Sequence, residues 1–258
     1  MKICSLVEAA ISGFIFLLVA GNAAEPAELK VLSAVGIQAV MEDLGPKFEQ
    51  ATGHKLAIAF ANAGTTVKRI QDGEIADVVI TPQPGIESFV NDAKANADNV
   101  TVVARSGIGL AVRNGTPKPD ISSPEALKRT LLAAKSIAYS NPAGGAASGI
   151  HFAKVLDRLG IANEMKSKTV FPKSGPVGVL VANGEAELGV AQIQELMSIA
   201  GIEIIGPLPG DLQDTIVFSA AIMASARDTE ASRALVNFLR TPEAAAVIKA
   251  KGMEPATP

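Results

Sequence analysis

A chain of 258 residues, with 48% hydrophobic and 19% charged side chains, is long enough to bury the core of one or two domains. Its 23 basic side chains against 26 acidic ones leave a net charge of −3, so it lacks the basic excess of a nucleic-acid-binding protein. Aromatic residues make up only 4%, with no Trp, which argues against stacking surfaces for sugars or bases.

The N-terminus has the three parts of a secretory signal: Lys2, an apolar run over 9–20, and small residues around Ala23. The alternative is a membrane anchor, but the run is shorter than the roughly 20 residues that span a bilayer. We therefore predict a signal peptide over 1–23, cleaved near Ala23, and a mature periplasmic chain without an integral membrane segment. Cys4 lies inside this signal, so we expect no disulfide and no cysteine nucleophile in the mature protein.

Short apolar runs alternate with helical patterns from residue 28 onward. Val40, Leu44 and Phe48 have helical spacing, and Gly53 is a natural stop for that helix. Such alternation is typical of a parallel sheet covered by helices on both faces. In this part of the chain we expect strands over 28–34, 55–61 and 76–81, and helices over 36–53, 64–74 and 84–93.

Two apolar runs then flank Arg105 and Ser106, and an extended segment of this kind can carry the chain from one domain to another. A second alternating unit begins with Ser123 as a helix cap and Pro124 at the first helical position. In this unit we expect helices over 123–134, 148–160 and 175–185, and strands over 136–140, 168–171 and 186–192.

The long apolar run over 215–225 can form the return crossing, and Pro242 divides the final helical region into two helices. This order of segments predicts two α/β lobes, of which the first is discontinuous. Lobe I is expected to comprise 27–105 plus 218–258, and lobe II 106–217.

Four strand-to-helix loops share one design, in which a strand ends in small residues and a helix starts at once. Small side chains leave backbone N–H groups accessible, and the first turn of a helix has unpaired donors. Such loops gather at the carboxyl ends of parallel strands, where ligands bind, although tight turns also use these residues for conformational reasons alone. The loops at 33–38, 61–68, 140–151 and 172–178 therefore predict a cleft lined with anion donors.

Nucleotide, hydrolase and metal motifs do not fit the chain. From Gly144 onward, Ile150 and His151 stand where GxxxxGK[ST] needs Lys and Ser or Thr. No GxGxxG fits this loop, and no GxSxG elbow occurs. The two histidines, His54 and His151, are far apart in sequence, so no metal is expected. We interpret His54 as a solvated loop residue and His151 as a helix residue beside the cleft.

Cations near the four loops are Lys68, Arg69, Arg105 and Lys173. Arg105 lies in the expected crossing strand, from which its guanidinium can reach a carboxylate between the lobes; the alternative is a charge on a surface strand. Lys68 and Arg69 are adjacent on a helix, so at most one of them can face the cleft.

The stretch "ELKVLSAVGIQAVMEDLGPKFEQATGHKLAIAFANAGTTVKRIQDGEIADVVIT", with "GEAELGVAQ" and "TPEAAAVI" later, resembles bacterial periplasmic molybdate-binding proteins. These belong to the broad family of type II solute-binding proteins, and the similarity covers nearly the whole mature chain. The resemblance implies a type II periplasmic-binding-protein fold, whose two α/β lobes close by hinge motion on an oxyanion without metal or cofactor. We expect a monomer that binds a small anion and has the permease of an ABC importer as its partner.

Carried onto this chain, the family's two ligand serines fall at Gly36 and Ala63 and its tyrosine at Gln192, so three side-chain donors differ. Thr65 or Thr66 can supply a displaced hydroxyl. These losses weaken the case for a tetrahedral oxyanion and favour a larger, planar carboxylate. The predicted ligand-binding residues are Gly36, Ile37, Gly64, Thr65, Thr66, Arg105, Ala147, Ser148, Gly149, Lys173, Val177 and Gln192.

The same broad family includes exported enzymes resembling aconitate isomerase, which move a double bond within a tricarboxylate and need no cofactor. Such a reaction requires a group that shuttles a proton, and His151 is the first candidate. Capture of a small anion for an importer is the leading hypothesis, and isomerisation of a small polycarboxylate is the alternative.

Overall fold

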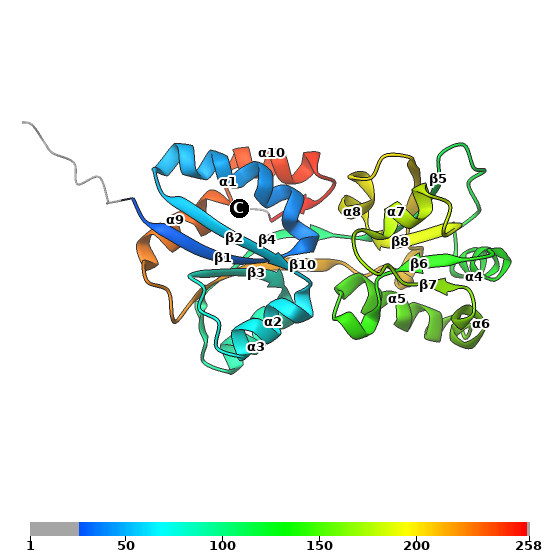
Figure 1. Cartoon of the computed structure of the whole chain (residues 1–258), viewed down its shortest axis with the longest axis horizontal. Helices are drawn as coiled ribbons and strands as arrows, with labels where there is room; N and C mark the ends of the chain where they lie inside the picture. The colour runs from blue at the N-terminus through cyan, green and yellow to red at the C-terminus, as the bar shows by residue number, and fades with distance from the viewer. Residues whose placement is uncertain (1–25, 257–258) are drawn as a thin grey trace, which may run out of the picture.

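A computed structural model of the chain describes residues 26–256, so the predicted signal peptide lies outside the described residues. Two α/β lobes lie side by side along the long axis, each built on one sheet (Figure 1). Lobe I holds the six-stranded sheet and lobe II the five-stranded sheet. None of the helices within 26–256 is long and apolar enough to cross a bilayer.

The sheet of lobe I draws its strands from both ends of the described chain. In spatial order they are β11 (Glu254–Pro255), β4 (Ala95–Ser106), β10 (Ile216–Met223), β3 (Val78–Pro82), β1 (Glu28–Ala34) and β2 (Lys55–Ala61). β1 pairs in parallel with β2 and β3, whereas β10 runs antiparallel to β3 and β4. In lobe I, the expectation of a parallel sheet is therefore correct for the first three strands only. β4 leads the chain to lobe II and β10 brings it back, so these two strands run in opposite directions.

The sheet of lobe II repeats this mixture on a smaller scale. Its spatial order is β7 (Thr169–Val170), β6 (Ile137–Tyr139), β8 (Leu188–Gln192), β5 (Ile108–Arg113) and β9 (Ile202–Pro207). β6 is parallel to β7 and β8, and β5 is antiparallel to β8 and β9. The parallel strands of both lobes thus keep a common carboxyl edge, from which helices start.

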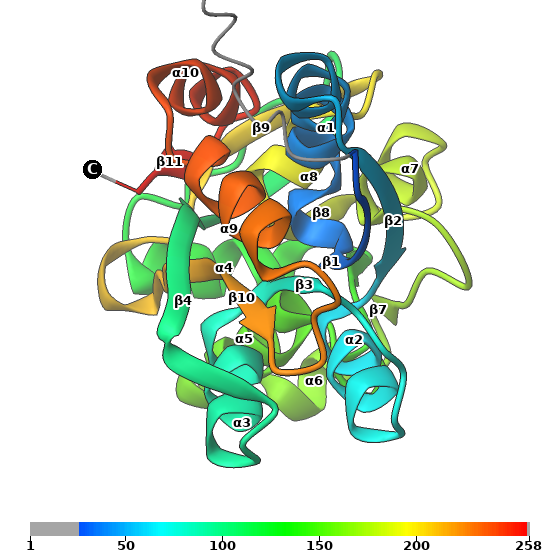
Figure 2. The same ribbon diagram turned by 90° about the vertical axis from the view of Figure 1, so that its left-hand side faces the viewer.

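Helices cover both faces of the sheet in lobe I (Figures 1 and 2). One face carries α1 (Gln38–Thr52), α9 (Thr229–Phe238) and α10 (Pro242–Ala250), and the other carries α2 (Ala63–Gln71) and α3 (Gln83–Asn91). Phe48 and Ile80 belong to the buried cluster under the first face, whereas Phe89 and Val79 belong to the cluster under the second. Neighbouring residues of β3 thus point to opposite faces and are both buried, which explains why this strand is an unbroken apolar run.

In lobe II, α4 (Pro124–Ala133), α5 (Ala147–Arg158) and α6 (Ala162–Lys166) lie on one side of the sheet, and α7 (Val177–Ala182) and α8 (Ile193–Met197) on the other (Figure 1). Single 3-10 turns form η1 (Val35–Ile37), η2 (Pro142–Gly144) and η3 (Gly210–Leu212). α6, α8 and β9 are not evident from the sequence pattern. Helices of five residues are too short to show a helical period.

Local signals at helix ends behave as expected. Gly53 is in the left-handed conformation and ends α1, and Ser123 accepts a hydrogen bond from the backbone N–H of Ala126. Thr241 caps α10 in the same way, with Pro242 as its first residue. The predicted cap at Ser123 and the break at Pro242 are both confirmed.

The prediction that His54 is solvated is wrong. Its side chain is buried, and its Nδ1 accepts a hydrogen bond from the backbone N–H of Ala27 at 3.1 Å. Its ring stacks on Phe48 with 6.0 Å between ring centroids. The start of β1 runs beside the turn that holds His54, and this tertiary contact removes the ring from solvent.

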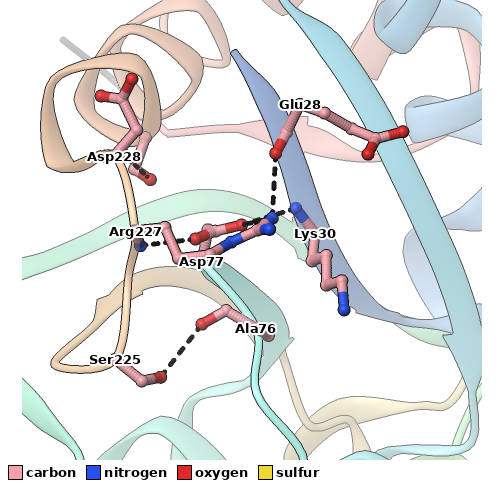
Figure 3. Close-up of polar contacts among 8 residues, drawn as sticks. Glu28, Lys30, Ala76, Asp77, Ser225, Arg227 and Asp228 are labelled. Carbon is pink, nitrogen blue, oxygen red and sulfur yellow. Dashed lines mark hydrogen bonds and ion pairs between the residues drawn. The ribbon is translucent and has the colours of Figure 1, made fainter.

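A buried carboxylate joins three segments at the base of lobe I (Figure 3). The side chain of Asp77 accepts hydrogen bonds from the backbone N–H groups of Lys30 and Arg227, both at 2.7 Å, and from the Arg227 guanidinium at 3.2 Å. Burial acts to raise the pKa of Asp77, but these donors outweigh it and hold the pKa below its ordinary value. Asp77 therefore fastens β1 and β3 to the turn between β10 and α9.

The chain crosses between the lobes twice. β4 leads to β5 at Gly107, and the return runs from η3 into β10. The side-chain amide of Gln213 binds the backbone of Ile108 twice, through Oε1 at 3.0 Å and Nε2 at 2.9 Å, so it ties the two crossings together. The predicted lobe boundaries, 105/106 and 217/218, fall beside this connection and are kept as a proposal.

Candidate functional site

The predicted ligand positions follow the carboxyl ends of five strands. In lobe I, the turn η1 follows β1 and the first turn of α2 follows β2; these hold Gly36, Ile37, Gly64, Thr65 and Thr66. In lobe II, α5 begins after β6, α7 after β7 and α8 after β8; the positions there are Ala147, Ser148, Gly149, Val177 and Gln192. Contacts between the lobes bring these two edges together, and we call the region between them the interlobe site.

The helices at this edge begin without side-chain caps. No side-chain cap hydrogen bond is formed at the N-terminus of α2, α5 or α7, nor at that of α3 or α6, whereas α4, α9 and α10 are capped by Ser123, Asp228 and Thr241. The first N–H groups of an uncapped helix need another acceptor, and the helix dipole favours a negative one. The helix ends at the interlobe site can therefore favour a negatively charged group.

The first contact between the lobes is made at Gly36. A Cβ atom on Gly36 would lie 2.8 Å from Nε2 of Gln192 and 2.7 Å from the ring of Phe218, so a larger residue here would require these side chains to move. The carbonyl oxygen of Gly36 accepts a hydrogen bond from Nε2 of Gln194 at 2.7 Å. The amide of Gln192 thus takes the space that a side chain at position 36 would need.

A chain of polar groups continues from this contact. Nε2 of Gln194 also donates to Oε1 of Gln192 at 3.0 Å, and Ser106 donates to Oε1 of Gln194. Nε2 of Gln192 donates in turn to Oε1 of Glu195 at 3.3 Å. Burial raises the pKa of Glu195 to about 7, so this carboxyl can both hold and release a proton near neutral pH.

The second contact between the lobes is made by two glycines. The backbone N–H of Gly64, in the first turn of α2, donates to the carbonyl oxygen of Gly145 at 3.1 Å. A Cβ atom on Gly64 would lie 2.9 Å from the Cα atom of Gly145, and one on Gly145 would lie 2.8 Å from that of Gly64. The N–H of Gly64, predicted as a ligand donor, is therefore bonded to lobe II in this arrangement.

The predicted hydroxyl donors differ in their accessibility. Thr65 is exposed in the first turn of α2, whereas Thr66 is fully buried, with its Oγ1 3.5 Å from the carbonyl oxygen of Ala61. Ser148 is buried in the first turn of α5. Thr65 is thus the hydroxyl in this loop that solvent, and hence a dissolved anion, can reach.

His151 faces the return crossing. Its Nε2 lies 2.8 Å from the carbonyl oxygen of Leu212, and its Nδ1 lies 3.4 Å from the carboxylate of Asp214. Both partners are hydrogen-bond acceptors. These contacts join α5 to the hinge segment, and the catalytic role of His151 stays a prediction.

The predicted cations separate into two groups. Lys68 pairs with Asp72 at 2.7 Å and Arg69 with Glu74 at 2.5 Å, both within lobe I. Arg105 lies near the end of β4, opposite Val217 in β10, and Lys173 is exposed in the loop before α7. Within residues 26–256, no ion pair involves Arg105 or Lys173, and Glu254 of β11 lies opposite Arg105 on the other side of β4.

Two shallow hollows lie away from the interlobe site. One, of about 280 Å³, is lined by Arg129 and Glu187 among others, and one, of about 480 Å³, by Lys30 and Ile75 among others. No predicted ligand residue lines either of them. The described part of the chain also has no group of three or more His, Cys, Asp or Glu side chains placed to hold a metal ion.

Sequence reasoning missed Gly145, Gln194 and Glu195. Gly145 lay inside the predicted loop over 140–151, but nothing local marks it as the contact of Gly64. Gln194 and Glu195 lie on α8, which is too short to be recognised from its pattern. The only signal for Gln194 and Glu195 in the sequence is that polar residues follow a buried strand in "AQIQE".

Comparison with known proteins identifies the family to which the chain belongs. Residues 29–254 match the model of the bacterial extracellular solute-binding protein family. Aconitate isomerase of a Pseudomonas species is 37% identical over 240 residues, which cover 90% of each chain. The molybdate-binding protein of Azotobacter vinelandii is 31% identical over 89% of this chain and 91% of its own sequence.

The fold agrees with these matches. The solved structure of the periplasmic molybdate-binding protein from Azotobacter vinelandii superposes with a TM-score of 0.72 at 25% identity, covering 87% of this chain and 98% of the other. The matched region contains all but the two terminal residues of the sheets and every loop of the interlobe site. The protein therefore belongs to the bacterial extracellular solute-binding protein family and has the two-lobed α/β fold of its molybdate-binding members.

Proposed function

We propose that the protein binds a small polycarboxylate of the aconitate or citrate class at the interlobe site and delivers it to an ABC importer. The observation that carries this proposal is the replacement at Gly36, where the amide of Gln192 takes the space of a side chain. The resemblance to molybdate-binding proteins implies a serine hydroxyl at that position. Because Gly36 has no hydroxyl and the amide of Gln192 lies beside it, the site suits a larger, planar anion better than a tetrahedral one.

Other groups support a carboxylate ligand. The uncapped ends of α2 and α5 offer backbone N–H donors, and Thr65 offers a hydroxyl. Arg105 and Lys173 can add positive charge, and the guanidinium fork of Arg105 matches a carboxylate in geometry. The identity of 37% to an aconitate isomerase over 90% of both chains is consistent with a tricarboxylate site.

We also propose that the protein is exported from the cytoplasm. The signal peptide over 1–23, cleaved near Ala23, would release a monomeric protein into a periplasm, where it would meet the permease of its importer. Membership of an extracellular family supports this location. Mass spectrometry of the protein secreted from a bacterial host would measure the mature N-terminus, and an unprocessed Met1 would contradict the signal.

A thermal-shift panel tests the ligand class, because a ligand that binds only the folded state stabilises it by mass action. Citrate, cis-aconitate and trans-aconitate are compared with molybdate, tungstate and sulfate. A ligand present at about 100 times its Kd adds about 2.7 kcal/mol, equivalent to a rise in Tm of roughly 5–10 °C for a chain of this size. Stabilisation by molybdate or tungstate alone would refute the carboxylate proposal, and no response to any anion would refute the site.

Isomerisation of a bound polycarboxylate is the second candidate function. It is favoured by the aconitate isomerase relative and by Glu195, a carboxyl that can exchange a proton near neutral pH beside the interlobe contact. A base would remove a proton from the methylene carbon next to the double bond, the electron pair would shift along the three-carbon unit, and a proton would return at the other end. Atoms and charge balance without a cofactor.

Turnover separates the two candidates. With cis-aconitate in D2O, an isomerase would produce trans-aconitate carrying deuterium, visible by NMR, whereas a receptor would bind the substrate and leave it unchanged. Glu195→Gln should abolish turnover while ligand binding remains, and His151→Ala tests the prediction from the sequence. Loss of turnover in His151→Ala but not in Glu195→Gln would assign proton transfer to the histidine.

A further inference from the structure

Gly64 and Gly145 touch back to back across the two lobes. The N–H of Gly64 donates to the carbonyl oxygen of Gly145 at 3.1 Å, and a Cβ atom on either residue would come within 2.9 Å of the other's Cα atom. Both colliding groups are backbone, which cannot rotate away as a long side chain can. The contact therefore depends on glycine at both positions.

The two glycines differ in what their own lobes demand. Gly145 has φ of 74°, a left-handed conformation that favours glycine regardless of any contact. Gly64 is not among the residues with positive φ and lies in the first turn of α2, where alanine is the better helix former. Within lobe I alone, Gly64 thus has no conformational reason to be glycine, and the reason comes from lobe II.

We propose that Gly64 and Gly145 form a clasp that holds the two lobes closed over the interlobe site and thereby sets how long a ligand stays bound. This rests on the proposed binding function but not on the identity of the ligand. The clasp joins the first turn of α2 to the loop before α5, while the contact of Gly36 with Gln192 and Gln194 joins η1 to the end of β8 and the start of α8. A bound anion would be enclosed between these two contacts.

The clasp predicts effects of opposite sign for one substitution. Gly64→Ala adds a methyl group that collides only when the lobes are closed, so it should reduce the closed population and speed ligand release. The same substitution should raise the Tm of the ligand-free protein or leave it unchanged, because alanine favours the helix. If Gly64 had a merely structural role, its substitution would lower both the closed population and the Tm.

Gly144→Ala is the matched control. Gly144 neighbours the clasp in sequence, but a Cβ atom there would meet nothing within 4 Å, and its φ is outside the left-handed region. Both variants thus make the same chemical change. Gly64→Ala makes it in the contact itself, and Gly144→Ala makes it one residue away from the contact. Any general effect of alanine in these loops would appear in both.

Spin-label distance measurements test the clasp directly. Labels are placed on Asn91→Cys at the end of α3 and Lys154→Cys on α5, both exposed, in a Cys4→Ser background that removes the only native thiol. Figure 1 shows these helices on the same side of the two lobes. Distances are recorded by pulsed electron paramagnetic resonance without ligand and with saturating citrate or cis-aconitate.

We expect the ratio of the short-distance to the long-distance population to fall about tenfold in Gly64→Ala and to match the wild type in Gly144→Ala; tenfold corresponds to about 1.4 kcal/mol, the size of one hydrogen bond. A Gly64→Ala distribution that superimposes on that of the wild type overturns the clasp. If Gly64→Ala differs from the wild type but no carboxylate changes either distribution or Tm, the clasp stands and the proposed ligand class fails.

Discussion

Replacing Asp77 by Asn should destabilise the base of lobe I, where one carboxylate joins β1, β3 and the turn that follows β10 (Figure 3). The side chain of Asp77 is 1% exposed and accepts two backbone hydrogen bonds, from Lys30 and Arg227, and a third from the Arg227 guanidinium. An asparagine of the same shape can keep one backbone bond through its oxygen, but its NH2 group then faces the other donor. Hydrogen bonds to charged groups contribute about 1.5–3 kcal/mol each, so we expect a loss of roughly 2–4 kcal/mol at pH 7.

The pH dependence of this loss has a definite sign. The donors hold the pKa of Asp77 below its ordinary value, against the opposing effect of burial, whereas the unfolded chain has a pKa near 3.9. A depressed pKa in the folded state stabilises the protein fully above the unfolded value, and that stability is lost as the pH falls through the folded value. The difference between wild type and Asp77→Asn should therefore be constant from about pH 7 to 5 and shrink below about pH 4.

Urea unfolding followed by circular dichroism at pH 7, 5 and 3 measures these differences. The matched control is Asp72→Asn, which removes an exposed carboxylate paired with Lys68 four residues earlier and should cost at most about 0.5 kcal/mol. A loss below about 1 kcal/mol for Asp77→Asn at pH 7, or a full difference retained at pH 3, would refute the reasoning.

Three further changes have defined outcomes. Glu195→Gln should stabilise the protein by about 1–3 kcal/mol at pH 8 but not at pH 4.5, since a raised pKa costs stability only above the unfolded value; equal Tm values at pH 8 would contradict this. Gln194→Ala, which removes the bond to Gly36, should weaken carboxylate binding about tenfold by calorimetry, and an unchanged Kd would argue against it. Ser123→Ala should lower the free energy of unfolding by about 1 kcal/mol in urea, and an unchanged value would contradict the role of this cap.

Several local features were predictable because their causes lie within a few residues. The bounds of β1 and β2 agree with the apolar runs 28–34 and 55–61, and the Ser123 cap and the Gly53 stop follow from the chemistry of single residues. His54 was mispredicted because its burial depends on Ala27 and Phe48, which reach it from outside its own turn. The short helix α8, which carries Gln194 and Glu195, was also missed, because five residues do not show a helical period.

By itself, the sequence determined the alternation of strands and helices, the two-lobed α/β class and the loops at which helices begin, because periodicity and turn residues act over short distances. Only the tertiary structure decided which residues of those loops meet. Gln194 contacts Gly36 across 158 positions of the chain, and Gly64 contacts Gly145 through backbone atoms that have no side-chain signature. Such contacts depend on how the two sheets face each other, which follows from the path of the crossing strands rather than from any local pattern.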